Sequence, residues 1–149
     1  MKKLLVLTLV FILAACSVAT PSEYDQNLKN WGDANLTHYR FKLSLICFCV
    51  FTDQMPLTVE VEDGEVVSVT NQAGETVVPS DDLYQYYEPY LTVDRLFAEL
   101  GVVLSGEAEE VLVTYDSTYG YPVDVTIDYI KEAIDDELYI QISDLEVLK

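Results

Sequence analysis

The longest alternating stretch of the chain, residues 39–51, predicts a β-strand. One of its faces is apolar throughout, whereas the other begins with charged residues and becomes apolar at Ile46, Phe48 and Val50. Because side chains alternate between the two faces of a strand, we expect this one to be buried on one face at its start and on both faces at its end. Such a pattern is typical of a central strand.

Five further segments have the alternation or the β-rich composition of strands: residues 57–62, 65–70, 110–115, 121–129 and 138–147. The first two flank Asp63-Gly64, a dipeptide that accepts the positive φ of a tight hairpin turn. The alternation of the last segment slips near Ser143-Asp144, which indicates a β-bulge.

Apolar residues at helical spacing predict two helices. The first covers residues 23–35 after Ser22, a favourable N-cap, and the second begins after Thr92 and ends near Gly106. The order helix–strand–strand–strand therefore occurs twice, as a pseudo-repeat of pattern with negligible sequence identity between its halves. It predicts a single α+β domain over residues 23–149, an antiparallel sheet of about six strands with both helices on one face.

The residues before this domain have the pattern of an export signal. A short basic segment (residues 1–3) and an apolar run (residues 4–13) are followed by Ala14, Ala15 and Cys16. The apolar run is shorter than the roughly 20 residues that a helix needs to span a bilayer, so it predicts a signal peptide. An ordinary signal peptide with a coincidental cysteine is the alternative to a lipid attachment site.

The small residues directly before Cys16 resemble the lipobox of bacterial lipoproteins. The resemblance implies a signal peptide over residues 1–15, a lipidated cysteine and short tether over residues 16–22, and palmitate-type acyl chains on Cys16. Two or more acyl chains anchor a protein stably. We therefore expect an exported, extracytoplasmic protein held at the membrane by Cys16. Ser17 resembles the lipoproteins that reach the outer membrane, where the host has one.

The chain is strongly acidic, with 8 basic and 26 acidic residues. Cleavage before Cys16 would remove Lys2 and Lys3 and leave a net charge of −20. A field of this sign repels nucleic acid and anionic headgroups, so we expect no nucleic-acid partner and membrane contact through the lipid alone. It favours cationic partners or divalent ions, or serves only solubility.

Cys47 and Cys49 are the cysteines that remain beside the lipidated one, and in an exported protein they suggest a disulfide. On a regular strand their Cα atoms would lie about 6.6 Å apart, at the outer edge of disulfide geometry. A bulge or turn is therefore needed to join them. Two buried thiols, or less readily a metal site, are the alternatives.

Tyrosines in two segments are candidates for a binding surface. One group stands in an irregular region and the other in the loop 116–122, and together they are Tyr84, Tyr86, Tyr87, Tyr90, Tyr119 and Tyr121. Tyrosine combines a large apolar ring with a polar end, which suits a protein or glycan partner in the envelope. Packing over the core, with Asp116 and Gly120 forming a turn in the loop, is the structural alternative.

The inventory of catalytic residues is poor. His38 is the single histidine, no Gly-x-Ser-x-Gly segment is present, and neither a phosphate-binding loop nor a dinucleotide fingerprint occurs. We expect no enzyme activity, no catalytic residue, no cofactor and no metal. Calcium bound by residues 135–137, or by Asp116 with loop carbonyls, is a weaker possibility because the spacing does not match an EF-hand.

Several segments resemble an uncharacterised family of secreted bacterial proteins and lipoproteins, domain-of-unknown-function family 6174. The segments that carry the resemblance are Tyr39-Arg40-Phe41, Cys47-Phe48-Cys49, the hairpin at Asp63-Gly64, and residues 113–122, 127–130 and 135–137. The resemblance implies an exported small domain without an assigned activity. We therefore expect a lipoprotein that acts as a non-catalytic protein-binding or envelope-interaction module. The alternatives are a calcium-dependent or structural envelope component and, less readily, a hydrolase.

Overall fold

The computed structural model describes residues 22–149. The predicted signal peptide, Cys16 and all of the tether except Ser22 lie outside these residues. The elements of the described part, in chain order, are α1 (Glu23–Ala34), β1 (His38–Ile46), η1 (Thr52–Gln54), β2 (Leu57–Glu62), β3 (Glu65–Thr70), α2 (Tyr84–Tyr87), η2 (Glu88–Tyr90), α3 (Val93–Val102), η3 (Val103–Glu107), β4 (Glu110–Tyr115), β5 (Pro122–Asp128) and β6 (Leu138–Val147).

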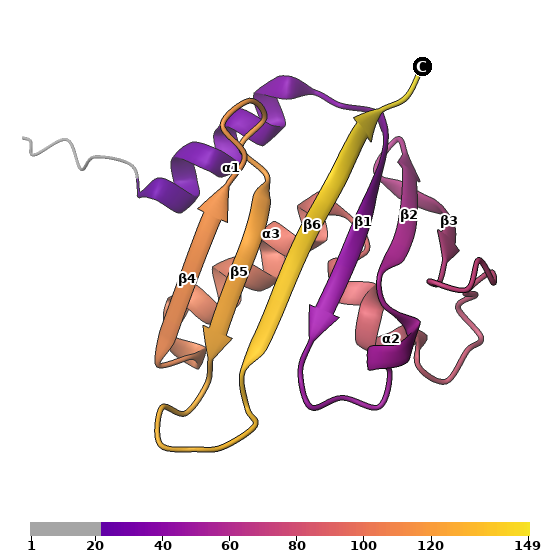
Figure 1. Cartoon of the computed structure of the whole chain (residues 1–149). Helices are drawn as coiled ribbons and strands as arrows, with labels where there is room; N and C mark the ends of the chain where they lie inside the picture. The colour runs from indigo at the N-terminus through magenta and orange to yellow at the C-terminus, as the bar shows by residue number, and fades with distance from the viewer. Residues whose placement is uncertain (1–21) are drawn as a thin grey trace, which may run out of the picture.

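All six strands form one antiparallel sheet in the order β3-β2-β1-β6-β5-β4. The sheet therefore consists of two three-stranded meanders joined by the pairing of the first strand with the last (Figure 1). This confirms the expected α+β class and antiparallel sheet. The pseudo-repeat is not confirmed, because β1 is central whereas its counterpart β4 is an edge strand.

The helices cover one face of the sheet, and the core lies between the two layers (Figure 1). Alternate residues of β1 point into it, and Tyr39, Phe41, Leu43 and Leu45 are all buried. The hydroxyl of Tyr39 accepts a hydrogen bond from the backbone N–H of Val93 at 3.3 Å, which ties the start of α3 to the central strand. Burial raises the pKa of Tyr39 to about 12.

Helix α1 is held to α3 by two polar contacts. The Tyr24 hydroxyl donates to the carbonyl of Phe97 at 2.9 Å, and the Trp31 indole N–H donates to Asp94 at 3.2 Å. Ser22 caps the helix as predicted, in a reciprocal capping box with Asp25.

The opposite face of the sheet is open to solvent, and ion pairs cross it at the centre. Arg40 on β1 pairs with Glu146 on β6 at 2.8 Å, and Lys42 pairs with Asp144 at 2.7 Å. The register of β1 and β6 shifts between Arg40 and Lys42, and Asp144 has a φ of 52°. The bulge predicted near this residue is therefore confirmed.

The β4–β5 loop packs against α1 at the end of the sheet where β5 begins (Figure 1). Asp116 organises it by accepting hydrogen bonds from the backbone N–H groups of Thr118 and Tyr119 at 2.9 and 2.6 Å. Gly120 has a φ of +81°, and a Cβ there would lie 2.7 Å from the carbonyl oxygen of Asn27 on α1. The loop therefore packs against the domain, which is the structural alternative that the sequence offered for residues 116–122.

We predict that Gly120→Ala lowers the free energy of unfolding by about 2–4 kcal/mol, because the new methyl group adds a steric clash to a left-handed backbone. Gly74→Ala is the matched control, since Gly74 has the same φ of +81° but nothing lies within 4 Å of the position that a Cβ would take there. That control should lose only about 1–2 kcal/mol. Equal losses in urea denaturation of the two variants would show that the contact with α1 is unimportant.

Candidate functional site

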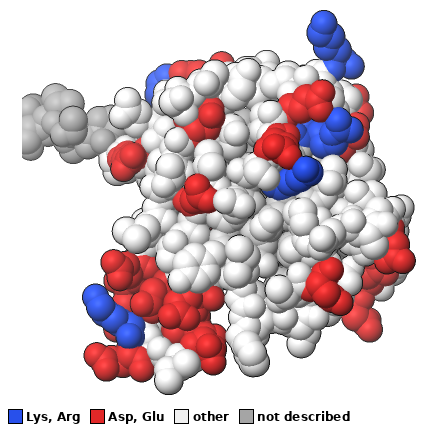
Figure 2. Space-filling model, in the orientation of Figure 1, with Lys and Arg blue, Asp and Glu red and all other residues white. Residues whose placement is uncertain are grey.

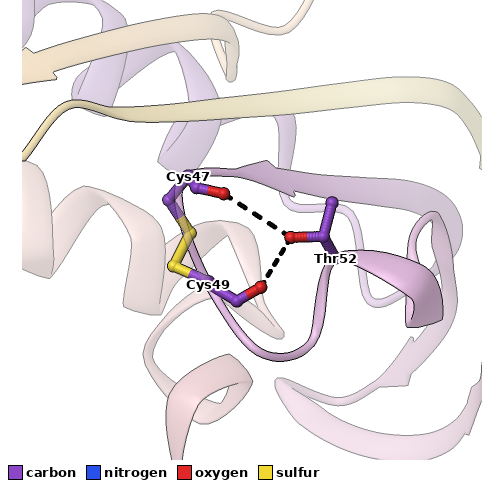
Figure 3. Close-up of a disulfide and its surroundings, with 3 residues drawn as sticks. All are labelled: Cys47, Cys49 and Thr52. Atoms are coloured by element: carbon purple, nitrogen blue, oxygen red, sulfur yellow. Dashed lines mark hydrogen bonds between the residues drawn. A yellow bond between two sulfur atoms is a disulfide. The ribbon is translucent and has the colours of Figure 1, made fainter. Parts of the chain in front are cut away.

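A tight turn follows β1 and brings Cys47 and Cys49 to disulfide-bonding distance (Figure 3). Their Cα atoms lie 5.2 Å apart, closer than the roughly 6.6 Å of a regular strand. The Thr52 hydroxyl donates to the carbonyl of Cys49 at 2.8 Å and lies 3.5 Å from that of Cys47, which braces the turn from the other side. The turn that the sequence required for a disulfide is therefore present.

The turn corrects two expectations about residues 39–51. The strand ends at Ile46, and the turn that follows brings the two cysteines closer than the roughly 6.6 Å that an extended backbone gives residues two apart. The second face is also not buried, since Ile46, Phe48 and Val50 are 52%, 89% and 81% exposed. These three apolar side chains therefore lie on the surface and do not contribute to a second core.

Phe48 and Val50 form a projection that we call the apolar tip. The turn that carries it is anchored by the next residue, Phe51, which is buried. The Phe51 ring packs edge-on against Tyr87 at a centroid distance of 5.2 Å and lies tilted against Tyr86 at 5.8 Å. The disulfide and the buried Phe51 thus fix the two ends of the turn, and the apolar tip between them is exposed to solvent.

Beside the apolar tip lies a groove of about 280 Å³. One wall is the disulfide turn, another is the α2–η2 segment, and the third is the connection between β5 and β6. The lining residues are Leu45, Cys47, Phe48, Cys49, Phe51, Tyr86, Tyr90, Tyr129, Asp135, Asp136, Glu137 and Leu138. The groove combines an apolar floor with an acidic rim.

The four tyrosines of the first group, residues 84–90, lie in three different environments. Tyr86 is half exposed and lines the groove together with Tyr90, whose pKa burial raises to about 12. Tyr87 is buried in the core, and Tyr84 lines a separate hollow next to β3. The candidate surface formed by all four side chains is therefore corrected to Tyr86 and Tyr90.

The second tyrosine group lies at the other end of the sheet. Tyr119 and Tyr121 are partly buried against the core, and Tyr121 packs edge-on against Trp31 at 6.2 Å. They belong to the loop between β4 and β5, whereas the groove is at the end where β1 stops and β6 begins (Figure 1). The two tyrosine groups therefore do not form one surface, and neither Tyr119 nor Tyr121 stands free as a loop-tip anchor.

The acidic rim consists of Asp135, Asp136 and Glu137, in the connection between β5 and β6. Asp136 accepts a hydrogen bond from the backbone N–H of Ile130 at 2.7 Å, and Asp135 has a φ of 70°. None of the ion pairs found within residues 22–149 includes a carboxylate of the rim. Figure 2 shows acidic side chains gathered at this corner, at the lower left of the view, whereas acidic and basic side chains lie together at the upper right of the sheet face.

The other candidate chemistry is placed elsewhere. His38 bonds to Glu60 at 2.9 Å at the start of β1, the end of that strand farthest from the groove. Asp116, one of the possible calcium ligands, is engaged by backbone amides. Among residues 22–149, no cluster of three or more His, Cys, Asp or Glu side chains has the arrangement of a metal site. The same residues include no helix long and apolar enough to cross a membrane.

Sequence reasoning missed the apolar tip because it assigned Phe48 and Val50 to a buried strand face. A signal for their exposure was available, since a disulfide between Cys47 and Cys49 interrupts the strand and leaves the residue between them outside it. The groove itself had no local signal, because its walls come from three separate parts of the chain.

Comparison with known proteins gives one match. Residues 23–147 match the model of a family described as a family of unknown function, DUF6174, and both the apolar tip and the groove lie within that range. No curated protein and no solved structure matches the chain.

Asp128, at the end of β5, is predicted to respond to pH. Burial raises its pKa, and Asp136, Glu137, Glu110 and Glu109 raise it further; its Oδ1 atom has no hydrogen-bond partner within the described residues. A carboxyl group with a raised folded-state pKa binds protons more readily when folded. It therefore destabilises the fold at neutral pH, and the penalty is relieved as the pH falls through the folded-state pKa.

We predict that Asp128→Asn raises the thermal midpoint at pH 7 by a few degrees, and that this gain shrinks as the pH is lowered, because the wild-type carboxyl group then becomes neutral. Asp124→Asn removes the same charge from the same strand and serves as the control, with no comparable gain. A midpoint lowered by Asp128→Asn at pH 7 in a calorimetric pH series would contradict the prediction.

Proposed function

The chain belongs to the DUF6174 family, and because that family has no assigned function, we propose one from the site: a lipid-anchored, extracytoplasmic protein-binding module without catalytic activity. Its binding surface is the apolar tip together with the groove beside it. The module is held at the membrane by acyl chains on Cys16 and presents the tip to another envelope protein.

The observation that carries this proposal is the exposure of Phe48 and Val50 on a turn whose two ends are tied to the fold. Burying one such side chain is worth about 1.5–3 kcal/mol, so a fold that leaves two close neighbours in water forgoes stabilisation. Single exposed apolar residues are common on protein surfaces. Here, however, a disulfide, a buried phenylalanine and a threonine hydrogen bond tie down the backbone of the turn that carries both side chains. A preordered apolar surface loses little entropy on binding, which favours a partner.

The position of the tether is compatible with this role. Ser22, where the tether meets the domain, lines a hollow together with Val111 and Tyr115 of the edge strand β4. The apolar tip follows the central strand β1, three positions across the sheet from β4. Anchoring through Cys16 would therefore leave the tip free for another molecule.

A protein partner suits the tip better than a glycan does. Phe48 and Val50 offer apolar surface without a polar group, whereas an interface core between proteins is apolar and rich in aromatic side chains. The absence of catalysis is supported by the separation of His38 from the groove, which leaves the lining without a histidine base.

We predict that Cys16→Ser abolishes incorporation of an alkyne-labelled fatty acid into the protein in a bacterial host and releases the protein from the membrane fraction. Ser17→Ala is the control and should keep the label, because it leaves the acylated thiol unchanged. Continued labelling of Cys16→Ser would refute the anchor while leaving the binding surface to be tested separately.

We predict that a photoreactive benzoylphenylalanine at position 48 forms a light-dependent adduct of discrete mass with another protein in intact cells. The same residue at Val67, which is 51% exposed on the edge strand β3, is the control and should give no such adduct. Adducts of equal yield at both positions, or adducts to lipid alone, would contradict the proposal. The lipid outcome would instead make the tip a membrane contact.

A further inference from the structure

We infer that the groove accepts a protein segment in which an apolar side chain stands next to lysine or arginine. The apolar side chain would fill the space between the disulfide turn and Tyr86, and the cation would face Asp135, Asp136 and Glu137. This inference rests on the proposed function, since it specifies the partner chemistry of the same surface.

The size of the groove favours one or two side chains of a protein segment. Its volume of about 280 Å³ is below the roughly 300–1,000 Å³ of pockets that enclose a whole small molecule. Leu45, Phe51 and Leu138 contribute apolar groups to the lining. An aliphatic or aromatic side chain would therefore be desolvated there, with Phe48 and Val50 covering the adjacent part of the partner.

The negative charge of the rim favours a basic residue in the partner, next to the apolar side chain that enters the groove. The cation of this chain closest in sequence, Lys131, is engaged with other carboxylates: its ammonium group lies 4.0 Å from Glu110, and its backbone N–H donates to Glu109 at 2.7 Å. The three rim carboxylates are thus not neutralised by an ion pair within residues 22–149. An incoming lysine or arginine would supply the missing countercharge, whereas an acidic segment would be repelled.

The charge balance at this corner differs from that at the centre of the open sheet face. On the open sheet face Arg40 and Lys42 already balance Glu146 and Asp144. The same rim disfavours a bilayer as the occupant, since anionic headgroups would approach a concentration of like charge (Figure 2). The combination of apolar floor and unbalanced acid therefore points to a cationic, apolar segment.

The inference can be tested by selecting from a random 12-residue peptide display library on the lipidated protein, residues 16–149, held in phosphatidylcholine nanodiscs, with empty nanodiscs subtracted. A rim variant, D135N/D136N/E137Q, removes the charges while keeping hydrogen-bond acceptors, and asparagine tolerates the positive φ at position 135. A matched variant, E62Q/D63N/E65Q, removes the same charge from the exposed β2–β3 turn at the other end of the sheet. A tip variant, F48S/V50S, changes only exposed side chains.

We expect the selected peptides to be enriched in lysine or arginine beside leucine, isoleucine or phenylalanine. Their dissociation constants, measured by fluorescence anisotropy, should rise about tenfold or more with the rim variant and the tip variant, and less than about twofold with the matched variant. Raising the salt concentration should weaken binding to the wild type and leave binding to the rim variant nearly unchanged.

The other outcomes separate the two proposals. Equal weakening by the rim and matched variants would mean that overall charge attracts the peptides, and would overturn the inference. Peptides without basic residues that depend on the tip alone would also overturn it, while the binding surface of the proposed function would stand. Failure to obtain any peptide that depends on the tip would count against both.

Discussion

The pairing of β1 with β6 is the contact on which the rest of the structure depends. These are the first and last strands of the chain, and their pairing joins the two meanders into one sheet. Buried rows from both strands, including Phe41, Leu43 and Ile142, line up beneath the helices. At about 1.5–3 kcal/mol for each fully buried large side chain, this central face contributes strongly to the stability that offsets closing so long a loop. The same pairing places the end of β1 beside the start of β6, and the candidate site is built there.

The site follows from the way in which β1 ends. A short disulfide loop stops the strand at Ile46, and Phe51 returns the chain to the core a few residues later. The residues between them are held in solvent because both ends of the turn are fixed. The start of β6 then brings the acidic connection from β5 against the same turn. A surface with apolar and acidic parts thus arises from two connections that are far apart in sequence, and its function as a binding surface is our proposal.

Electrostatic balance differs between the regions of the molecule. The basic residues near the centre of the sheet are paired across β1 and β6, whereas β5 ends at Asp128, whose pKa is raised by burial and by the neighbouring acids. Such an unbalanced cluster costs stability at neutral pH. Together with the exposed apolar tip, it identifies a region in which the chain departs from what stability alone favours, and such departures are expected at functional sites.

Local pattern was enough to predict six strands, the end of the first excepted, and the two main helices, the hairpin at Asp63-Gly64 and the bulge near Asp144, because each depends on local periodicity or on a residue that tolerates positive φ. It also indicated that a disulfide between Cys47 and Cys49 would need a bulge or a turn. Tertiary structure alone decided that β1 lies beside β6, that Tyr87 is buried while Phe48 is exposed, and that the acidic connection borders the groove. The physical reason is that alternation records which residues share a face. Whether that face meets a core, a partner or water depends on chain segments distant in sequence.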